Sequence, residues 1–474
     1  MPPRHAATWP ALPPNETLSH TADDLRSTKP AFDPPPFDRI PSAGRIRTRL
    51  QYTEAWARRG GSSTLAGATR TGRAGGLSMM VWIGFSLAVA LLIVVSRRDL
   101  ALGMAVAAVV LAVFTHTWGS FGAALWATVS SPSVLLLSLV VGVIPLIGGV
   151  MQATGEMDRL VDNLRIGIRP FLALAPGLLG MLPMPGGALL SAPLVERGAG
   201  AAPSDVKSAA NIWFRHVVLL IYPLGAEFIA SAKVAGLEVY YVIPFLIPTF
   251  VLMVLLGYVF LLRRVRGRIS SAGPFSLSGL MVPLVIILIA PLLDFLMKRL
   301  VALPYTELGT VTGVMVSLIL ALTIGRMGWA AFGRVVRKAA PWKYMLIIVA
   351  MFAFLNTFQA SGVPERIQEL SLSPVLLCVV IGFLLGLITG RMQAPMLIIV
   401  PIYVETYGPV TGSVFALTYF SVFLGFILTP VHPCISVTLA YFHTSLHGFL
   451  RRVAAPTAVA WLMALGFALW LFRG

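Results

Sequence analysis

Apolar stretches long enough to cross a bilayer follow one another through most of this 474-residue chain, and they constrain its fold more than any other feature. A membrane-spanning helix needs about 20 consecutive apolar residues. Two apolar stretches, 170–195 and 374–404, are interrupted at their centres. The sequence predicts an all-α polytopic membrane protein. Its expected spans are 79–96, 99–117, 133–151, 207–230, 240–262, 279–297, 304–325, 342–359, 411–430 and 453–472.

Composition and charge agree with this fold class. Hydrophobic residues make up 57% of the chain and charged residues only 12%, whereas soluble proteins average about 25% charged. The net charge of +17 would indicate a nucleic-acid partner for a soluble protein. Here the basic residues gather in alternate loops, such as 263–268 and 326–338, while the loop 118–132 carries no charge. The positive-inside rule assigns the basic loops to the cytoplasm, so we expect a multi-pass protein of the inner (cytoplasmic) membrane, with the lipid bilayer and no nucleic acid as partner.

The first 78 residues differ from the rest of the chain. They contain no long apolar run, are rich in proline and are basic. A segment of this kind buries too little apolar surface to fold. Two interpretations remain open: a disordered tail, or a start of translation nearer Met79 or Met80.

An internal repeat divides the apolar part. The pattern Q-A-[ST]-G-x-x-[DE]-R-[LI] occurs at 152–160 and again at 359–367. We therefore expect two transmembrane repeats, 79–268 and 269–474. Each repeat contains five spans and one broken hairpin, and an odd number of spans places the second repeat in the opposite orientation. The sequence thus predicts an inverted-topology repeat, which is typical of secondary transporters.

Two pairs of helix breaks fall at matching positions of the repeats. The breaks at 183–187 and 389–395 predict re-entrant hairpins, because Pro and Gly interrupt a helix and its freed backbone groups need a protein or aqueous lining. The breaks at 222–225 and 429–433 predict unwound helices that face the hairpins. We predict a substrate and ion site formed by Pro183, Met184, Pro185, Gly186, Gly187, Ser191, Asn211, Tyr222, Pro223, Glu227, Thr389, Gly390, Arg391, Gln393, Thr429, Pro430 and His432.

Charged residues inside a membrane are expensive, and this cost suggests roles for a few of them. Arg391, at the second hairpin tip, is our candidate for binding an anionic substrate group. Glu227 or His432 is expected to carry a coupling proton, because burial favours the neutral carboxyl and an imidazole changes charge near neutral pH. Asp294 is expected to form a local ion pair with Lys298 or Arg299.

The sequence offers no catalytic or metal-binding motif. Cys378 and Cys434 both lie in apolar surroundings, so we expect them to be packing residues. His443 and His447 have the spacing of a zincin helix, but the glutamate that such a motif requires is absent. We expect no enzymatic activity, no cofactor and no bound metal. The one ion that we expect is Na⁺ or H⁺, used for coupling.

The segment 182–193, with Glu196 after it, resembles the signature of a prokaryotic membrane protein family known as domain of unknown function 401, or DUF401. The segment 429–434 is similar to that family's second unwound segment, and the resemblance covers residues 79–474. It implies an inverted-repeat carrier of the ion-transporter superfamily, distantly related to carboxylate, citrate, gluconate and arsenite transporters. The Ser-Asn-Thr hairpin tips of the dicarboxylate/sodium branch are absent here.

These observations lead to a functional hypothesis. We expect a secondary active transporter of a small solute, an organic anion, coupled to H⁺ or Na⁺ and working by alternating access. A channel or efflux component is one alternative, and a membrane-embedded enzyme or assembly factor is another. Because related carriers often dimerise, a homodimer is a further expectation.

Overall fold

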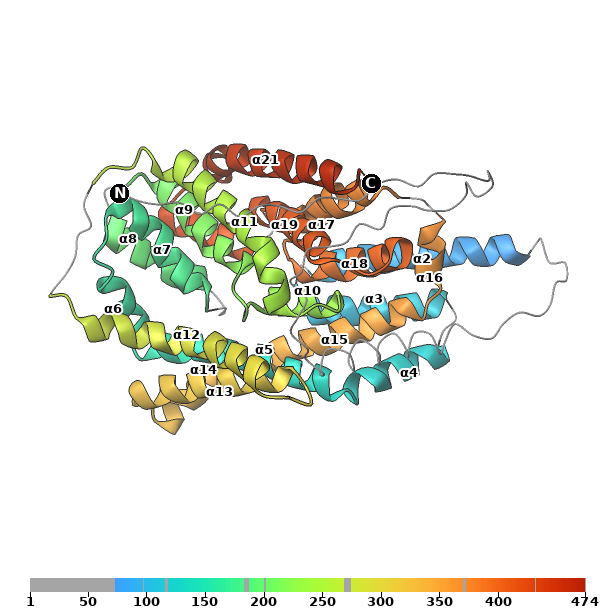
Figure 1. Cartoon of the computed structure of the whole chain (residues 1–474), viewed down its shortest axis with the longest axis horizontal. Coiled ribbons are helices and arrows are strands. Elements are labelled where there is room, and N and C mark those ends of the chain that lie inside the picture. Colours follow the sequence, from blue (N-terminus) through green and yellow to red (C-terminus); the bar gives the residue numbers. More distant parts are fainter. Residues whose placement is uncertain are drawn as a thin grey trace, which may run out of the picture. The chain divides into compact units, whose positions relative to one another are not determined.

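The computed structural model describes residues 73–96, 98–115, 118–182, 187–199, 202–267, 274–369, 372–430 and 432–473. All of them belong to one compact unit that covers residues 67–474. Nearly all of the N-terminal segment 1–78 lies outside the described residues. Within the described part of the chain, every regular element is a helix (Figure 1).

The first half of the apolar part forms ten α-helices, with one 3₁₀ turn (η1) and one π-helical turn (η2). They are α2 (Arg73–Ser96), α3 (Leu100–Phe114), α4 (Trp118–Val129), α5 (Pro132–Ala153), α6 (Glu156–Asp162), α7 (Ile168–Gly180), α8 (Gly187–Ala199), α9 (Ser204–Val217), η1 (Val218–Leu220), α10 (Ala226–Val234), α11 (Val239–Gly257) and η2 (Tyr258–Leu262).

Within the described residues, the second half also forms ten α-helices, with one π-helical turn. It contains α12 (Leu277–Leu300), α13 (Glu307–Ile324), α14 (Trp329–Ala339), α15 (Pro341–Gln359), α16 (Val363–Gln368), the π-helical turn η3 (Leu376–Ile381), α17 (Gly382–Thr389), α18 (Gln393–Tyr407), α19 (Gly412–Leu428), α20 (Pro433–Phe442) and α21 (Leu446–Leu471).

Polar capping residues mark where several apolar helices begin. The side chain of Asp99 accepts a hydrogen bond from the backbone N–H of Leu102 at the start of α3. Ser131 and Thr411 cap α5 and α19 in the same way. A cap of this kind satisfies a backbone donor that has no partner inside the helix. The caps explain why the chain re-enters a helix at these points directly after a short connection.

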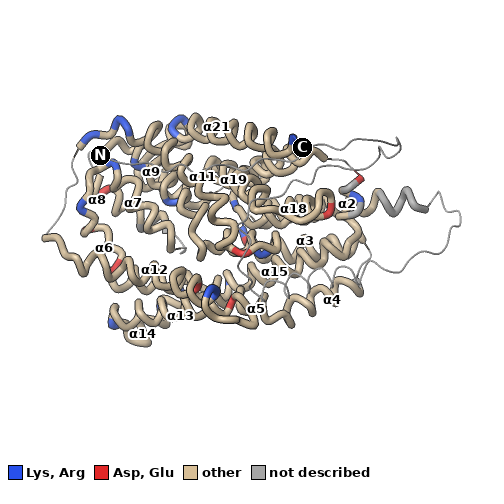
Figure 2. The backbone as a smooth tube through the Cα atoms, in the orientation of Figure 1, with Lys and Arg blue, Asp and Glu red and all other residues tan. Residues whose placement is uncertain are grey.

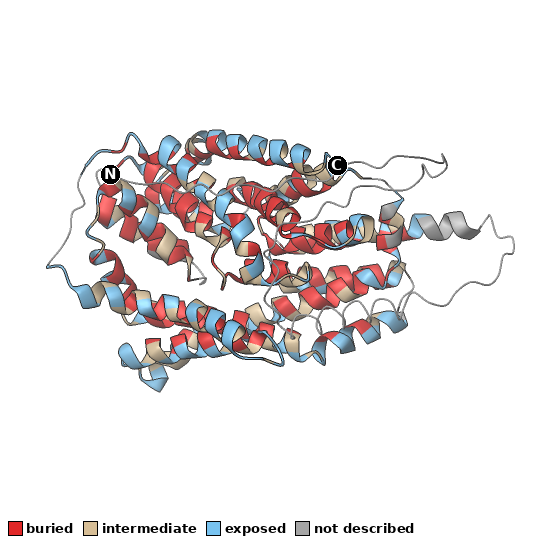
Figure 3. Cartoon of the chain, in the orientation of Figure 1, coloured by how far each residue is buried: buried red, intermediate tan, exposed pale blue. Residues whose placement is uncertain are grey.

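Within the described part of the chain, eight helical segments are long and apolar enough to cross a membrane, which fits a multi-pass membrane protein. They differ widely in burial (Figure 3). In the segment Gly412–Phe442, 88% of the apolar stretch is buried inside the protein, whereas in Leu277–Leu300 the buried share is 28%. The first is therefore surrounded by other helices, and the second presents apolar side chains outward, as expected for contact with lipid. The eight are Met79–Ser96, Pro132–Ala153, Val239–Leu262, Leu277–Leu300, Glu307–Ile324, Pro341–Gln359, Gly412–Phe442 and Leu446–Leu471.

Two of the ten predicted spans take a different form. The predicted span 99–117 is a shorter helix, α3, of 15 residues. The predicted span 207–230 is divided into α9 and α10 by the break at 218–225, so neither part reaches spanning length on its own. The break predicted at 222–225 accounts for this division of the span.

The contacts between helices define two bundles, each of which takes helices from both halves of the chain. The first bundle contains α2–α5 and α12–α15, in which α15 packs against both α3 and α5. The second bundle contains α7–α11 and α17–α21, in which α17 packs against α19, α7 against α9, and α20 against both α8 and α9. The short helix α6 packs against α12, and α16 packs against α18 (Figure 1).

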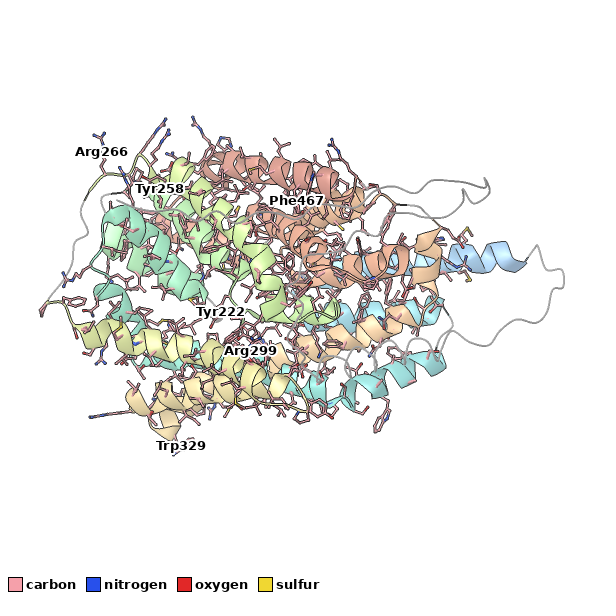
Figure 4. All side chains as sticks on the ribbon, viewed as in Figure 1. Tyr222, Tyr258, Arg266, Arg299, Trp329 and Phe467 are labelled. Atoms are coloured by element: carbon pink, nitrogen blue, oxygen red, sulfur yellow. The ribbon has the colours of Figure 1, made fainter. Side chains whose placement is uncertain are left out.

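Two helices were not expected from hydropathy. The uncharged loop at 118–132 contains α4, and the basic loop at 326–338 contains α14. Trp126 is 71% exposed and Trp329 is 85% exposed, and Figure 4 shows Trp329 at the periphery. In α14, Val335 and Ala339 are buried while the neighbouring Arg and Lys side chains are not. Exposed tryptophan with basic residues on an amphipathic helix is typical of a membrane interface.

Glycines allow the closest helix contacts of the second bundle. A Cβ atom on Gly386 would clash with the backbone carbonyl of Val422, so α17 and α19 meet backbone to backbone. A Cβ atom on Gly180 would clash in the same way with the carbonyl of Arg215, between α7 and α9. Gly382, Gly386 and Gly390 recur at four-residue spacing in the sequence, and Gly386 makes this helix contact. Gly390 instead ends α17, with a φ of 62°.

Candidate substrate and ion site

The predicted break at 389–395 is present. Helix α17 ends at Thr389, Gly390 adopts a left-handed backbone conformation, and α18 begins at Gln393. The Thr389 hydroxyl is 3.3 Å from the backbone N–H of Arg391 and accepts a hydrogen bond from it. Gln393 is buried at the start of α18. This turn therefore holds the Arg391 backbone at the junction of two half-length helices.

The matching break in the first half is only partly described. Pro183, Met184, Pro185 and Gly186 lie outside the described residues. Gly187 begins α8, and the buried Ser191 donates a hydrogen bond to the Ala188 carbonyl of the same helix.

Both predicted unwound segments are also present. Helix α9 gives way to a 3₁₀ turn and then to the non-helical residues 221–225 before α10 begins. Helix α19 ends at Leu428, and α20 begins at Pro433. Tyr222 and Thr429 are buried, Pro223 is half-buried and Pro430 is exposed. Figure 4 shows Tyr222 in the interior, away from the peripheral Arg266.

Polar side chains from these two segments meet although they lie more than 200 residues apart in the chain. The Nε2 atoms of His216 and His432 are 3.0 Å apart. Asn211 donates from its side-chain amide to the Thr438 hydroxyl at 3.2 Å. The Phe426 ring packs against both imidazoles, with centroid distances of 5.3 Å and 4.5 Å. The end of α9 therefore joins the beginning of α20 through polar contacts.

A buried guanidinium lies beside this contact. Arg215 is 6% exposed, and its guanidinium lies beside Cys434. Its Nη1 atom is buried and has no hydrogen-bond partner within the described part of the chain. The Oδ1 atom of Asn211 is in the same situation. Buried polar groups without partners are rare in folded proteins, so each of these two atoms needs an explanation.

Arg391 is the second cation of the site. Its Nε donates to the Ser96 carbonyl at 3.2 Å, and its charge interacts with those of Glu227 and Asp99. Glu227, half-buried in the first turn of α10, also interacts electrostatically with Tyr344, Tyr419 and Cys434. Glu227 therefore projects from the first half of the chain among residues of the second. Figure 2 shows charged residues of both signs among the helices as well as at their ends.

Asp294 forms a separate network, as expected. It pairs with Lys298 at 2.9 Å and accepts hydrogen bonds from Tyr240 and Thr310. Because its charge is balanced within α12 and its neighbours, Asp294 is not a member of the site.

The structure also adds residues that were not included in the predicted site. Arg215, His216, Cys434 and Thr438 join Asn211, Glu227, Arg391 and His432. Cys434 was expected to be a packing residue, but it lies next to the Arg215 guanidinium. Arg215 and His216 stand out in the sequence as polar groups beside the predicted unwound segments, although the predicted site did not include them. No sequence signal links them to Cys434, because that contact depends on how the two halves pack.

Comparison with known proteins places the chain in context. The model of a family described as "Protein of unknown function (DUF401)" matches residues 77–470. No curated protein matches the sequence. Among solved structures, the Alcanivorax borkumensis YdaH transporter is similar, with a TM-score of 0.52 and 19% sequence identity. The match covers 76% of this chain and 88% of that one. At this level of identity the likeness concerns the fold.

Proposed function

The chain belongs to the DUF401 family of proteins of unknown function, and we propose that this member is a secondary active transporter of a small organic anion. Its two halves would alternate access to the site between α9, α10, α20 and the turn at 389–393, with H⁺ or Na⁺ as the coupling ion. The unpaired Arg215 is the observation that carries the proposal.

A buried guanidinium without a counter-charge is strongly unfavourable in an apolar interior. Within the described residues, no carboxylate forms an ion pair with Arg215. An anion bound at Nη1 would supply both the missing acceptor and the missing charge. A carboxylate suits this position because it can accept two parallel hydrogen bonds from a guanidinium.

Charge at the site supports the same ligand class. Arg215 and Arg391 contribute two positive charges, while Glu227 is the carboxylate that interacts with Arg391 and Cys434. A small anion would supply the counter-charge that Arg215 lacks, since Arg391 already interacts with Glu227 and Asp99. Glu227 is suited to coupling, because a half-buried carboxylate can bind either a proton or Na⁺ in exchange for its interaction with Arg391.

The arrangement of helices supports an inverted repeat and alternating access. The order α2–α11 recurs as α12–α21, and in both halves residues of the site lie beside a helix break. The glycine contacts Gly180 to Arg215 and Gly386 to Val422 also correspond in position. The likeness to a solved transporter fold adds to this support. Inverted repeats with discontinuous helices are how many carriers expose one site alternately to the two sides.

Uptake into proteoliposomes tests the proposal. The purified full chain would be reconstituted and offered a panel of labelled mono- and dicarboxylates under an imposed pH or Na⁺ gradient. We expect saturable uptake of at least one anion, driven by one of the two gradients. Arg215→Gln should weaken apparent affinity about 10- to 100-fold, which corresponds to the loss of one charge-assisted hydrogen bond of about 1.5–3 kcal/mol.

Arg197→Gln is the matched control, because Arg197 is half-exposed on α8 and pairs with Asp158 at the surface. It should leave apparent affinity unchanged. Uptake of no anion under any gradient, by a monodisperse protein, would overturn the proposal. A current that rises linearly with voltage without saturation would instead identify a channel.

A further inference from the structure

The contact between His216 and His432 has an unusual arrangement of hydrogen-bond donors and acceptors. The two Nε2 atoms are 3.0 Å apart, and the rings are inclined by 79°. Nδ1 of His216 lies 2.6 Å from the Ile212 carbonyl. A carbonyl only accepts hydrogen bonds, so Nδ1 carries the proton of the neutral ring and Nε2 carries the lone pair. This lone pair points at His432.

The second imidazole is held in a corresponding way. The Gly390 backbone carbonyl hydrogen-bonds to His432. Since Nε2 of His432 faces His216, the nitrogen that donates to Gly390 is Nδ1. When both rings are neutral and donate through Nδ1, the two Nε2 lone pairs face each other at 3.0 Å. Such a contact is repulsive unless a cation lies between the two rings.

A third group completes a set of metal ligands. The Sγ atom of Cys434 and the ligand nitrogens of His216 and His432 all lie within 4.8 Å of one another. Zinc binds imidazole nitrogen at about 2.0–2.1 Å and thiolate sulfur at about 2.3 Å. Small side-chain rotations would therefore bring all three atoms onto one ion. Imidazole and thiolate ligands favour Zn²⁺ over Mg²⁺ or Ca²⁺, which prefer oxygen.

We propose that His216, His432 and Cys434 form a three-ligand Zn²⁺ site that joins the two halves of the chain. The inference goes beyond the proposed function, since it concerns binding of the metal alone. The carbonyls of Ile212 and Gly390 orient the imidazoles, as partners of metal-bound histidines generally do. His432 and Cys434 are half-buried rather than sealed in the core, which leaves a path for the ion.

The surrounding charges determine what the fourth coordination position holds. The Arg215 guanidinium lies beside Cys434. Arg215 and Arg391 also act on His432, so a bare dication would be disfavoured. Three protein ligands leave one position open. We therefore expect an anion such as hydroxide or chloride there.

Metal binding by the purified protein tests the site. The full chain in detergent would be stripped with a chelator under reducing conditions and titrated with Co²⁺ as a spectroscopic substitute for Zn²⁺. We expect one ion per chain, visible-range bands of a four-coordinate ion and a near-ultraviolet thiolate-to-cobalt band. Zn²⁺ should displace Co²⁺ and raise the melting temperature of the wild-type protein.

Variants identify the ligands. Cys434→Ser should abolish the thiolate band, and His432→Ala should weaken Zn²⁺ affinity by at least about tenfold and remove the thermal shift. Cys378→Ser and His443→Ala are the controls, because Cys378 is buried elsewhere and His443 ends α20. Both should bind like the wild type.

Two outcomes would overturn the proposal. One is the absence of stoichiometric binding by wild-type protein that is monodisperse and melts cooperatively. The other is binding that persists unchanged in Cys434→Ser or His432→Ala. Because no substrate is used, neither result depends on whether the protein transports an anion.

Discussion

At the scale of single residues, Glu227 is the group to which we assign the proposed ion coupling. It is half-buried at the start of α10, and its charge acts on Arg391, Tyr344 and Cys434. Glu227→Gln keeps the shape of the side chain and removes its charge and its exchangeable proton. If one proton is coupled to one substrate, a gradient of one pH unit supports about tenfold accumulation, because about 1.4 kcal/mol is then available.

We therefore expect Glu227→Gln to equilibrate the substrate without accumulating it, while exchange of labelled for unlabelled substrate continues. Glu238→Gln is the control, because Glu238 is exposed before α11. Accumulation ratios would be measured in proteoliposomes with a pH or Na⁺ gradient. Accumulation by Glu227→Gln at the wild-type ratio would exclude Glu227 from coupling.

At the scale of elements, the close approach of α17 and α19 depends on Gly386. Gly386→Ala would place a Cβ atom against the Val422 carbonyl, and two backbones cannot relax as a flexible side chain can. We expect a loss of about 1–3 kcal/mol in the free energy of unfolding, as is typical of overpacking. Denaturation of the protein in detergent would measure it.

Gly466→Ala on α21 provides the comparison, because its Cβ atom would meet open space. Alanine favours helix over glycine, so this variant should be as stable as the wild type or slightly more stable. Equal free energies of unfolding for Gly386→Ala and Gly466→Ala would show that the α17–α19 contact tolerates a side chain.

The elements that the sequence predicted are those with a local signal. The breaks beside Pro223, Gly390 and Pro430 were predicted because Pro and Gly weaken a helix, although single prolines such as Pro145 and Pro401 lie inside continuous helices. Helix α14 was missed because its apolar and basic residues alternate with helical period and lower its mean hydropathy. That periodicity was available in the sequence and could have revealed it.

The site was only partly predictable for a different reason. Asn211, Glu227, Arg391 and His432 were expected because polar residues beside a break in a membrane helix suggest function. The contacts of His216 with His432 and of Arg215 with Cys434 join residues that are far apart in the chain. Such contacts follow from the rotation of each helix about its axis, which hydropathy does not specify.

At the scale of the whole molecule, the contacts divide the helices by bundle rather than by repeat. Arg215, His216, Glu227, Arg391 and Cys434 belong to the second bundle or its connecting turns. The second bundle meets the first through contacts such as Arg391 to the Ser96 carbonyl and through the smaller contact of α15 with α18. Alternating access is therefore expected to move one bundle against the other and to break the Arg391–Ser96 contact.

The native Cys434 can report this movement. In a Cys378→Ser background with a chelator present, Cys434 is the remaining thiol, and it is half-buried in the site. If access alternates, a membrane-impermeant thiol reagent should reach Cys434 from one side at a time. Reversing the driving gradient should change which side that is, and a bound anion should slow labelling from both sides.

Trp329→Cys supplies the reference, because this position on α14 is 85% exposed. It would be introduced together with Cys434→Ser in the same Cys378→Ser background. It should react from one side only, whatever the gradient. Labelling of Cys434 from both sides at equal rates under every gradient would indicate a continuous pore. Labelling from one fixed side under every gradient would contradict alternating access, because the site would then never open to the other face of the membrane.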